Sequence, residues 1–114
     1  MSDAPVFKIL TPEQDAAFQA QGRFEGAPVD FEDGFIHLSA GPQVAETLAR
    51  HFPATGPLVL VALDPAQMPA SDLKWEVSRG GALFPHLYGT LQDHMVLWRH
   101  TLDDSRALPS GVEH

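Results

Sequence analysis

The chain has 114 residues, with 7 Lys and Arg against 15 Asp and Glu, a formal net charge of −8, and no cysteine. This length supports one hydrophobic core, and a negative field of this size disfavours broad binding to nucleic acid or to anionic membrane surfaces. The lack of cysteine excludes disulfides, thiolate nucleophiles and cysteine-based metal sites, and it favours a cytoplasmic location.

The first half of the chain predicts strands and helices in alternation. Thr11, Pro12 and Gln14 have the spacing of an N-cap, a first helical residue and a capping-box partner, so a helix begins here and ends near Gly22. A second helix follows from apolar residues three and four positions apart. The predicted order is a strand at Val6–Leu10, the first helix, a loop at Gln21–Asp30, a strand at Phe35–Ser39 and a helix from Val44 to His51.

The second half predicts strands without helices. Leu58–Leu63 is aliphatic throughout and indicates a central strand that is buried on both faces. Leu73–Val77 predicts a strand with one face in water, Ser78–Gly89 reads as irregular, and Met95–Trp98 reads as the last strand. Two early helices followed by several strands favour an α+β sandwich over an alternating α/β fold.

No segment of the sequence indicates a membrane-embedded or exported protein. The longest aliphatic run is far shorter than the roughly 20 residues that span a bilayer, and the acidic N-terminus lacks the pattern of a signal peptide. We expect one globular domain at residues 1–102 and a flexible C-terminal tail at residues 103–114.

The strand Phe35–Ser39, together with the preceding Asp33, is the first candidate site segment. Side chains alternate along a strand, so its two aliphatic residues share one face while His37 and Ser39 share the other. The aliphatic face is the core candidate, which leaves His37 and Ser39 to line a cleft. His37 can transfer a proton near neutral pH, and Ser39 and Asp33 can contact a ligand. In the alternative, His37 is a structural strand histidine and Ser39 caps the following helix.

Trp75–Gly89 is the second candidate segment, and Arg79 beside Gly80 and Gly81 is its main feature. Two glycines leave backbone N–H groups unshielded and allow positive φ, so the turn can bind an anion. Arg79 adds a bidentate donor suited to phosphate or carboxylate. In the alternative, this is an ordinary hairpin turn with a solvated arginine.

The aromatic part of the second segment offers a surface for a flat ligand. Phe84, His86 and Tyr88 lie two residues apart, so a base or a nicotinamide ring can stack on them if the segment is extended. Trp75 belongs to the same candidate site, and Glu76 beside it is either exposed or a site carboxylate. In the alternative, the aromatic residues close the core under a loop.

Other chemistries have weaker support. His37, His86 and His94 with Asp33 or Asp93 could supply metal ligands, but no pair has the helical spacing of a zinc protease. The sequence contains neither the Gly-x-Ser-x-Gly elbow of a serine hydrolase nor a glycine-rich phosphate-binding loop. We therefore expect no metal site.

Three segments in combination, Asp33–Ser39, Ser78–Gly81 and Phe84–Gly89, resemble the bacterial domain-of-unknown-function family 952 over roughly Val6 to Arg99. That family is remotely similar to the ADP-ribosyltransferase-like superfamily, whose fold is a split β-sandwich with a nicotinamide-dinucleotide cleft. The resemblance implies an α+β, ADP-ribosyltransferase-like split β-sandwich with two early helices. It makes NAD the cofactor to test, although no residue pattern by itself specifies a cofactor.

A second resemblance points to the same superfamily. Ile36–Ser39, Arg50 with His51, and Pro57–Leu60 are similar to a stretch of the RNA 2′-phosphotransferases. Those enzymes carry a histidine in the first strand, where this chain has Lys8, and their set of arginines is not evident here. The resemblance therefore supports the fold more than the activity.

The leading interpretation is a cleft for a small phosphorylated, nucleotide-like ligand such as NAD or an ADP-ribose derivative. The Arg79 turn would hold the anion, His37 and Ser39 would contact the sugar or the reacting centre, and the aromatic segment would enclose the base. An enzyme of this kind would be a transferase, with His37 or His86 as the proton-transfer group. The alternatives are a non-catalytic binding or sensor module with the same cleft, and a homodimeric interaction domain with the aromatic loop as its interface; the chain is a monomer or a homodimer.

Overall fold

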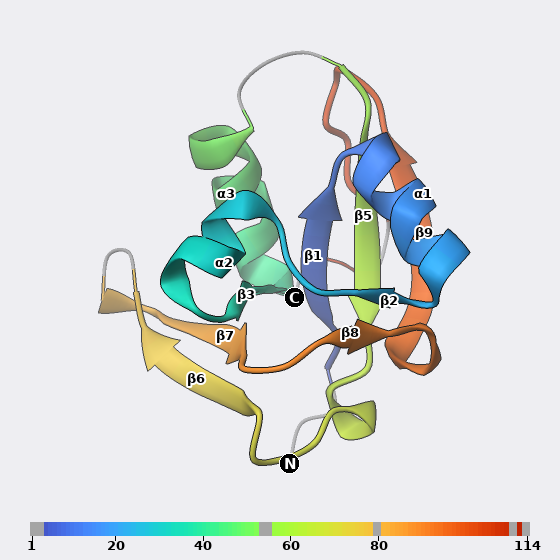
Figure 1. The fold of residues 1–114 in the computed structure, drawn as a ribbon. Helices are drawn as coiled ribbons and strands as arrows, with labels where there is room; N and C mark the ends of the chain where they lie inside the picture. Colours follow the sequence, from blue (N-terminus) through green and yellow to red (C-terminus); the bar gives the residue numbers. More distant parts are fainter. Residues whose placement is uncertain (1–3, 53–55, 79–80, 110–111, 113–114) are drawn as a thin grey trace.

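The computed structural model describes residues 4–52, 56–78, 81–109 and 112, and Figure 1 shows their arrangement. Its main sheet is antiparallel, with the strand order β4-β1-β5-β9. A second antiparallel sheet has the order β3-β7-β6, and β2 pairs with β8. The strands are β1 (Val6–Leu10), β2 (Arg23–Phe24), β3 (Ile36–His37), β4 (Ser39–Ala40), β5 (Leu58–Leu63), β6 (Leu73–Val77), β7 (Leu83–Leu87), β8 (Leu91–Gln92) and β9 (Val96–Leu102).

Helices cover both faces of the main sheet. The α-helices are α1 (Pro12–Gln21), α2 (Pro28–Asp33) and α3 (Val44–His51), and short 3-10 turns lie at η1 (Gly41–Gln43), η2 (Pro65–Gln67) and η4 (Asp93–Met95). The described part of the chain is thus a mixed α+β fold with several antiparallel sheets and few helices, as the sequence predicts at that level. Within the described residues, no helix is long and apolar enough to cross a membrane.

Strand β5 divides the core into two clusters, and its sequence explains why. Every residue of Leu58–Leu63 is buried, which confirms the predicted central strand. Alternate side chains point to opposite faces. Val59, Val61 and Leu63 therefore pack with α1 and with the strands of the smaller sheets, while the other three residues pack with α3. One short aliphatic run thereby anchors the layers on both faces of the main sheet.

Helix α1 begins and ends where the sequence predicts. The hydroxyl of Thr11 accepts a hydrogen bond from the Gln14 backbone, and the Gln14 side chain accepts one from the Thr11 backbone. Gly22 ends the helix at φ 77°, a left-handed conformation that a residue with Cβ rarely adopts. Helix α3 likewise ends at His51, as predicted.

Four local predictions are wrong. The expected loop at Gln21–Asp30 contains β2 and the start of α2. The expected irregular segment at Ser78–Gly89 contains β7, which forms a hairpin with β6. The expected single strand at Phe35–Ser39 is divided, because β3 pairs with β7 while β4 pairs with β1. The last strand begins at Val96 and not at Met95, which lies in η4.

The predicted boundary at residue 102 stays a prediction. Val112 lies within the segment for which we expect a flexible tail, yet its side chain is fully buried in the cluster under α3. At least this position of the C-terminal segment therefore packs on the domain.

A candidate ligand-binding cleft

A cleft of about 600 Å³ opens beside β1. Its lining comes from β1, the first turn of α1, α2, residues 37–39, α3, Ser78 and β7. Pockets that hold small ligands have volumes of several hundred Å³, so the cleft has the size of a ligand site. Its lining is apolar along Phe7, Ile9 and Phe84 and polar around His37 and Ser39.

The cleft exists because one segment of chain passes from the second sheet to the main sheet. Ile36 and His37 pair with β7, whereas Ser39 and Ala40 pair with β1. The pairing of β4 with β1 covers only Val6 and Phe7. The remainder of β1, which includes Lys8, therefore lies beside the cleft.

Asp30 is the centre of a buried polar network at the base of this cleft. Asp30 is 2% exposed, and its carboxylate lies 2.9 Å from the Lys8 ammonium. It also accepts hydrogen bonds from the backbone N–H groups of Ala27 (2.7 Å) and His37 (3.1 Å). The carboxylate thus holds the start of α2, His37 of β3 and Lys8 of β1 in one geometry.

The imidazole of His37 has a carboxylate at each ring nitrogen. Nδ1 lies 2.6 Å from Asp30 Oδ1, and Nε2 lies 2.8 Å from Asp33 Oδ2. The two carboxylates differ in exposure, because the Asp30 side chain is 1% exposed and the Asp33 side chain 47%. Asp30 therefore holds the ring from the buried side. Asp33 contacts the ring nitrogen on the solvent side, and a ligand can displace this exposed carboxylate.

The network keeps Asp30 ionised. Burial alone would raise the pKa of this carboxyl, but the hydrogen bond from His37, the charge of Lys8 and the Ala27 backbone N–H outweigh burial and lower the pKa to about 2. Burial lowers the pKa of Lys8, and the facing carboxylate of Asp30 opposes that effect. Lys8 also donates to the backbone carbonyl of His37 at 3.0 Å, so its ammonium is held by three acceptor atoms in all.

Ser39 and Thr47 form a hydroxyl pair in the wall of the cleft. Their oxygens lie 3.0 Å apart, and either can donate to the other. Ser39 is in β4 and not at a helix N-cap, so the alternative of a capping serine is wrong. Both hydroxyls belong to the cleft lining.

A second cluster lies across the paired strands β3 and β7, where His37 and His86 stand directly opposite each other. His86 Nδ1 and the Tyr88 hydroxyl both contact Glu76 Oε1 at 2.8 Å. The Phe35 ring stacks on His86 with centroids 4.1 Å apart, and it lies 4.6 Å from the His37 ring. One aromatic ring therefore joins the two histidine clusters.

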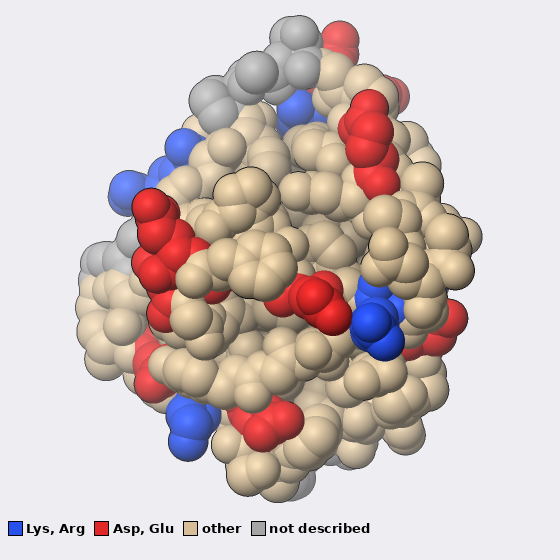
Figure 2. Space-filling model, viewed as in Figure 1, with Lys and Arg blue, Asp and Glu red and all other residues tan. Residues whose placement is uncertain are grey.

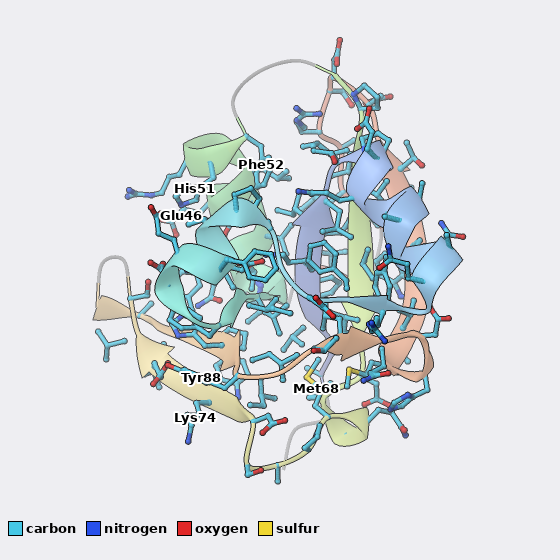
Figure 3. The ribbon with its side chains drawn as sticks, in the orientation of Figure 1. Glu46, His51, Phe52, Met68, Lys74 and Tyr88 are labelled. Atoms are coloured by element: carbon cyan, nitrogen blue, oxygen red, sulfur yellow. The ribbon has the colours of Figure 1, made fainter. Side chains whose placement is uncertain are left out.

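Glu76 is a charged partner in this cluster. Hydrogen bonds from His86 and Tyr88 lower the pKa of Glu76, and the same contact raises the pKa of Tyr88. Glu76 could be a purely exposed residue or a carboxylate of the candidate site. Its contacts with His86 and Tyr88 support the second interpretation. Figure 3 shows Tyr88 and Lys74 on this hairpin, with Lys74 extending away from the body of the molecule.

The structure brings together half of the predicted site residues in one cleft. The predicted residues that line it are Asp33, His37, Ser39, Phe84 and His86. Tyr88 lies next to them through Glu76. Phe84 is only 4% exposed, so it offers little surface to a partner, whereas Tyr88 is 39% exposed; the homodimer alternative stays a prediction.

Trp75 lies away from this group. It pairs with Pro85, whereas its neighbour Lys74 pairs with His86. Paired residues share a face of a sheet and adjacent residues alternate, so Trp75 is on the face opposite His86. Its side chain is 46% exposed.

The glycine turn is described only in part. Arg79 and Gly80 lie outside the described residues. Gly81 has φ 80°, as expected for this turn, but its N–H donates to the carbonyl of Ser78 at 3.1 Å. That N–H closes the β6–β7 hairpin. At Gly81 the structure therefore matches the alternative of an ordinary hairpin turn, in which this N–H is not available to an anion. Ser78, beside Arg79 in sequence, lines the cleft.

The described residues form no metal site, and the face in Figure 2 carries no basic patch. Among the described residues, no group of three or more His, Asp or Glu side chains is placed to hold a metal ion. On the face shown in Figure 2, acidic residues are spread over the surface and basic residues are separate from one another.

Sequence reasoning missed the roles of Asp30, Lys8 and Thr47. Ala27, Pro28 and Asp30 carry a usable signal, since Pro at the first position and an acidic residue at the third are typical of a helix start. A charged residue at the centre of an apolar strand, as Lys8 is, also indicates a buried ion pair. Thr47 carries no comparable signal.

The fold and the cleft define a small α+β protein with a ligand-sized site between β1, α2, α3 and β7. The chain belongs to the family described as "Protein of unknown function (DUF952)", whose model matches residues 9–99. This confirms the family that the sequence motifs resemble.

Solved structures of one relative have the same fold. The crystal structure of protein CC0527 from Caulobacter crescentus is 48% identical, covers 94% of each chain and superimposes with a TM-score of 0.82. The solution NMR structure of CC0527 is 51% identical over 87% of this chain and 84% of that chain, with a TM-score of 0.75. No curated protein matches the chain.

Proposed function

We propose that the cleft binds a small phosphorylated, nucleotide-like ligand of the NAD or ADP-ribose type. The observation that carries this proposal is the meeting of His37, Ser39, Phe84 and His86 in one cleft of about 600 Å³. These residues come from segments about 45 positions apart in sequence, and they combine an apolar wall with polar groups at fixed positions. That combination is typical of sites for organic ligands.

The lining of the cleft is richer in nitrogen hydrogen-bond donors than the composition of the whole chain suggests. The chain has a formal net charge of −8. The titratable residues that line the cleft are Lys8, His37, His51, His86 and Asp33, and the Asp30 carboxylate lies directly behind Lys8 and His37. Figure 3 shows His51 at the C-terminal end of α3. Arg79 follows Ser78 of the lining in sequence and remains the proposed phosphate partner, with a bidentate geometry that suits phosphate.

The proposed chemistry rests on His37. Asp30 holds Nδ1 from the buried side, and Asp33 occupies Nε2 at an exposed position. A ligand hydroxyl that displaces Asp33 would face a fixed imidazole nitrogen, which is the arrangement of a general acid or base. The geometry supports a group-transfer enzyme in which His37 handles the proton, with Ser39 against the ligand sugar and His86 as the second candidate.

The finer fold assignment, an ADP-ribosyltransferase-like split β-sandwich, belongs to the same proposal. Residues 36–40 support this assignment. Their chain leaves the second sheet after His37 and joins the main sheet at Ser39, so the two sheets separate where the cleft opens.

A non-catalytic binding module is the second candidate. Each histidine of the cleft already contacts a carboxylate, His37 at both nitrogens and His86 at Nδ1. Such contacts also suit residues that only position a ligand. The two candidates differ in their response to loss of the His37 ring.

The first experiment is calorimetric titration of the protein with NAD, ADP-ribose and nucleoside diphosphates. Ser39→Ala with Thr47→Val removes both wall hydroxyls and is expected to weaken binding roughly tenfold, the effect of one or two lost hydrogen bonds. Arg23→Ala, on the exposed side chain of β2, is the control and should leave the affinity unchanged.

His37→Ala then separates the two candidates. For an enzyme, this variant binds ligand but loses turnover; for a binding module, no turnover is found in either protein. If none of the ligands binds at millimolar concentration, the proposed function is wrong.

A further inference from the structure

Strand β6 is the outer strand of its sheet in the part of the chain that the structure describes. The order β3-β7-β6 leaves one side of β6 without a neighbouring strand, and Figure 1 shows β6 at the margin of the molecule. Trp75 and Val77 on this strand are 46% and 69% exposed. An unpaired strand edge with apolar side chains is a template for pairing with another strand.

The backbone of Trp75 points toward the open side of β6. Trp75 pairs with Pro85, and the carbonyl of Pro85 accepts from the Leu38 N–H at 3.0 Å, on the β3 side. In an antiparallel ladder, the N–H and C=O of one residue point to the same side. Pro85 therefore exchanges no hydrogen bonds with Trp75, and the N–H and C=O of Trp75 face outward.

The side chains on either side of Trp75 make the edge complementary to itself. Lys74 and Glu76 flank Trp75 in the sequence Leu73–Val77. When two copies of this strand pair antiparallel about Trp75, Lys74 of each copy stands opposite Glu76 of the other. Opposite charges in directly facing positions stabilise a strand pair, and like charges destabilise it.

We propose that β6 pairs antiparallel with β6 of a second copy of this chain, centred on Trp75. The two tryptophans then form the hydrogen-bonded central pair, with Leu73 opposite Val77 on each side. The three-stranded sheets of the two copies join into one continuous sheet.

The charges specify this register. If the centre moves by one residue toward the N-terminus, Lys74 stands opposite Lys74 of the second copy. If it moves by one residue toward the C-terminus, Glu76 stands opposite Glu76. Both neighbouring registers place like charges together, so only the register centred on Trp75 gives two opposite-charge pairs and a closed, two-fold dimer.

This dimer has a consequence for the cleft cluster. Glu76 contacts His86 and Tyr88 within its own chain. In the dimer, the partner's Lys74 lies next to the same carboxylate. Pairing therefore adds a cation from the second copy beside the histidine cluster, whatever ligand the cleft binds.

Charge-reversal variants test this pairing by sedimentation equilibrium of the full chain. Lys74→Glu gives two acidic positions on the edge, and Glu76→Lys gives two basic positions. Each variant alone is expected to self-associate roughly tenfold more weakly than the native protein, because both cross-strand pairs become repulsive. An equimolar mixture of the two variants should recover association, because every facing pair is then opposite in charge.

Two further variants secure the interpretation. Arg23→Glu makes the same change in net charge as Lys74→Glu, on the exposed side of β2, and should not alter association. Trp75→Lys places two ammonium groups at the centre, on the face away from His86, and should abolish association without disturbing Glu76. The proposal is wrong if the native protein remains at 12.4 kDa at about millimolar concentration, if Trp75→Lys leaves the association constant unchanged, or if the mixture fails to associate.

Discussion

Replacing Asp30 by Asn removes the charge at the centre of the buried network while it preserves the shape of the side chain. The Lys8 ammonium, 7% exposed, then loses its carboxylate partner. Removing one partner of a buried ion pair typically costs about 3–5 kcal/mol, because the remaining charge is left uncompensated. That is a large part of the total stability expected for a domain of this size.

The same substitution changes how stability depends on pH. The pKa of Asp30 is lowered from 3.8 to about 2 in the folded protein. A lowered pKa means that the stabilisation is present above the unfolded value and is lost as pH falls through it toward the folded value. At 1.36 kcal/mol per pKa unit, the native protein should lose about 2 kcal/mol from this group between pH 5 and pH 2. The Asp30→Asn variant lacks this contribution at every pH.

Urea unfolding followed by tryptophan fluorescence measures both effects. The Asp30→Asn midpoint should fall by roughly 2 M urea at pH 7, and its distance from the native midpoint should shrink as the pH is lowered to 2. Asp33→Asn is the control. Its carboxylate contacts the same imidazole but is 47% exposed, so the cost should stay below about 1 kcal/mol.

A double-mutant cycle completes this test. Lys8→Met combined with Asp30→Asn should cost less than the sum of the two single changes, since the double variant leaves no buried charge unpaired. Additive effects, or a cost of Asp30→Asn below about 1 kcal/mol at pH 7, would refute the buried network as the structure describes it.

Three further predictions concern other parts of the molecule. Tyr88 is the single tyrosine, so ultraviolet titration reports it alone; Glu76→Gln should lower its pKa toward 10.0, and an unchanged titration would contradict the contact. Leu60→Ala, in the middle of β5, should cost about 2–5 kcal/mol in urea unfolding, whereas a cost below about 1 kcal/mol would mean that this position is not packed as described. Thr11→Ala should lower the stability by about 1 kcal/mol through loss of the α1 cap, and thermal unfolding should show no effect if the cap is absent.

The sequence predicts those features of the fold that depend on local chemistry. The Thr11 cap, the left-handed Gly22 and the buried strand Leu58–Leu63 all follow from a few adjacent residues, and all are confirmed. The alternation of Ile36 and Leu38 toward the core also holds, since both are buried.

The errors arise where long-range contacts decide the structure. Helix α2 has six residues, too few to show a periodic pattern, and Asp30 stabilises it through Lys8, 22 positions away. The break between β3 and β4 depends on which sheet offers a partner strand, which local sequence does not encode. Nearness in sequence predicts that Trp75 and His86 share a site, but the register of the hairpin places them on opposite faces.

In the candidate site, too, features that depend on local sequence were predictable, and features that depend on long-range pairing were not. His37 and Ser39 share a predicted strand segment, and their common cleft was predictable from alternation. The contact of His86 with Glu76 requires the β6–β7 pairing, and local sequence predicts an irregular segment in place of β7. The anion role of Arg79 remains a prediction.

The central claim is that His37, Ser39, Phe84 and His86 form one site for a nucleotide-like ligand. The most direct measurement is an amide chemical-shift titration of the labelled protein with ADP-ribose and NAD, with ribose and inorganic phosphate as separate probes. Binding in this cleft should give saturable shifts concentrated at residues 33–39 and 78–89 and in α3 near Thr47, stronger for ADP-ribose than for either fragment. Shifts that are absent at millimolar ligand, or that concentrate on the face of β9 around Leu97, would contradict it.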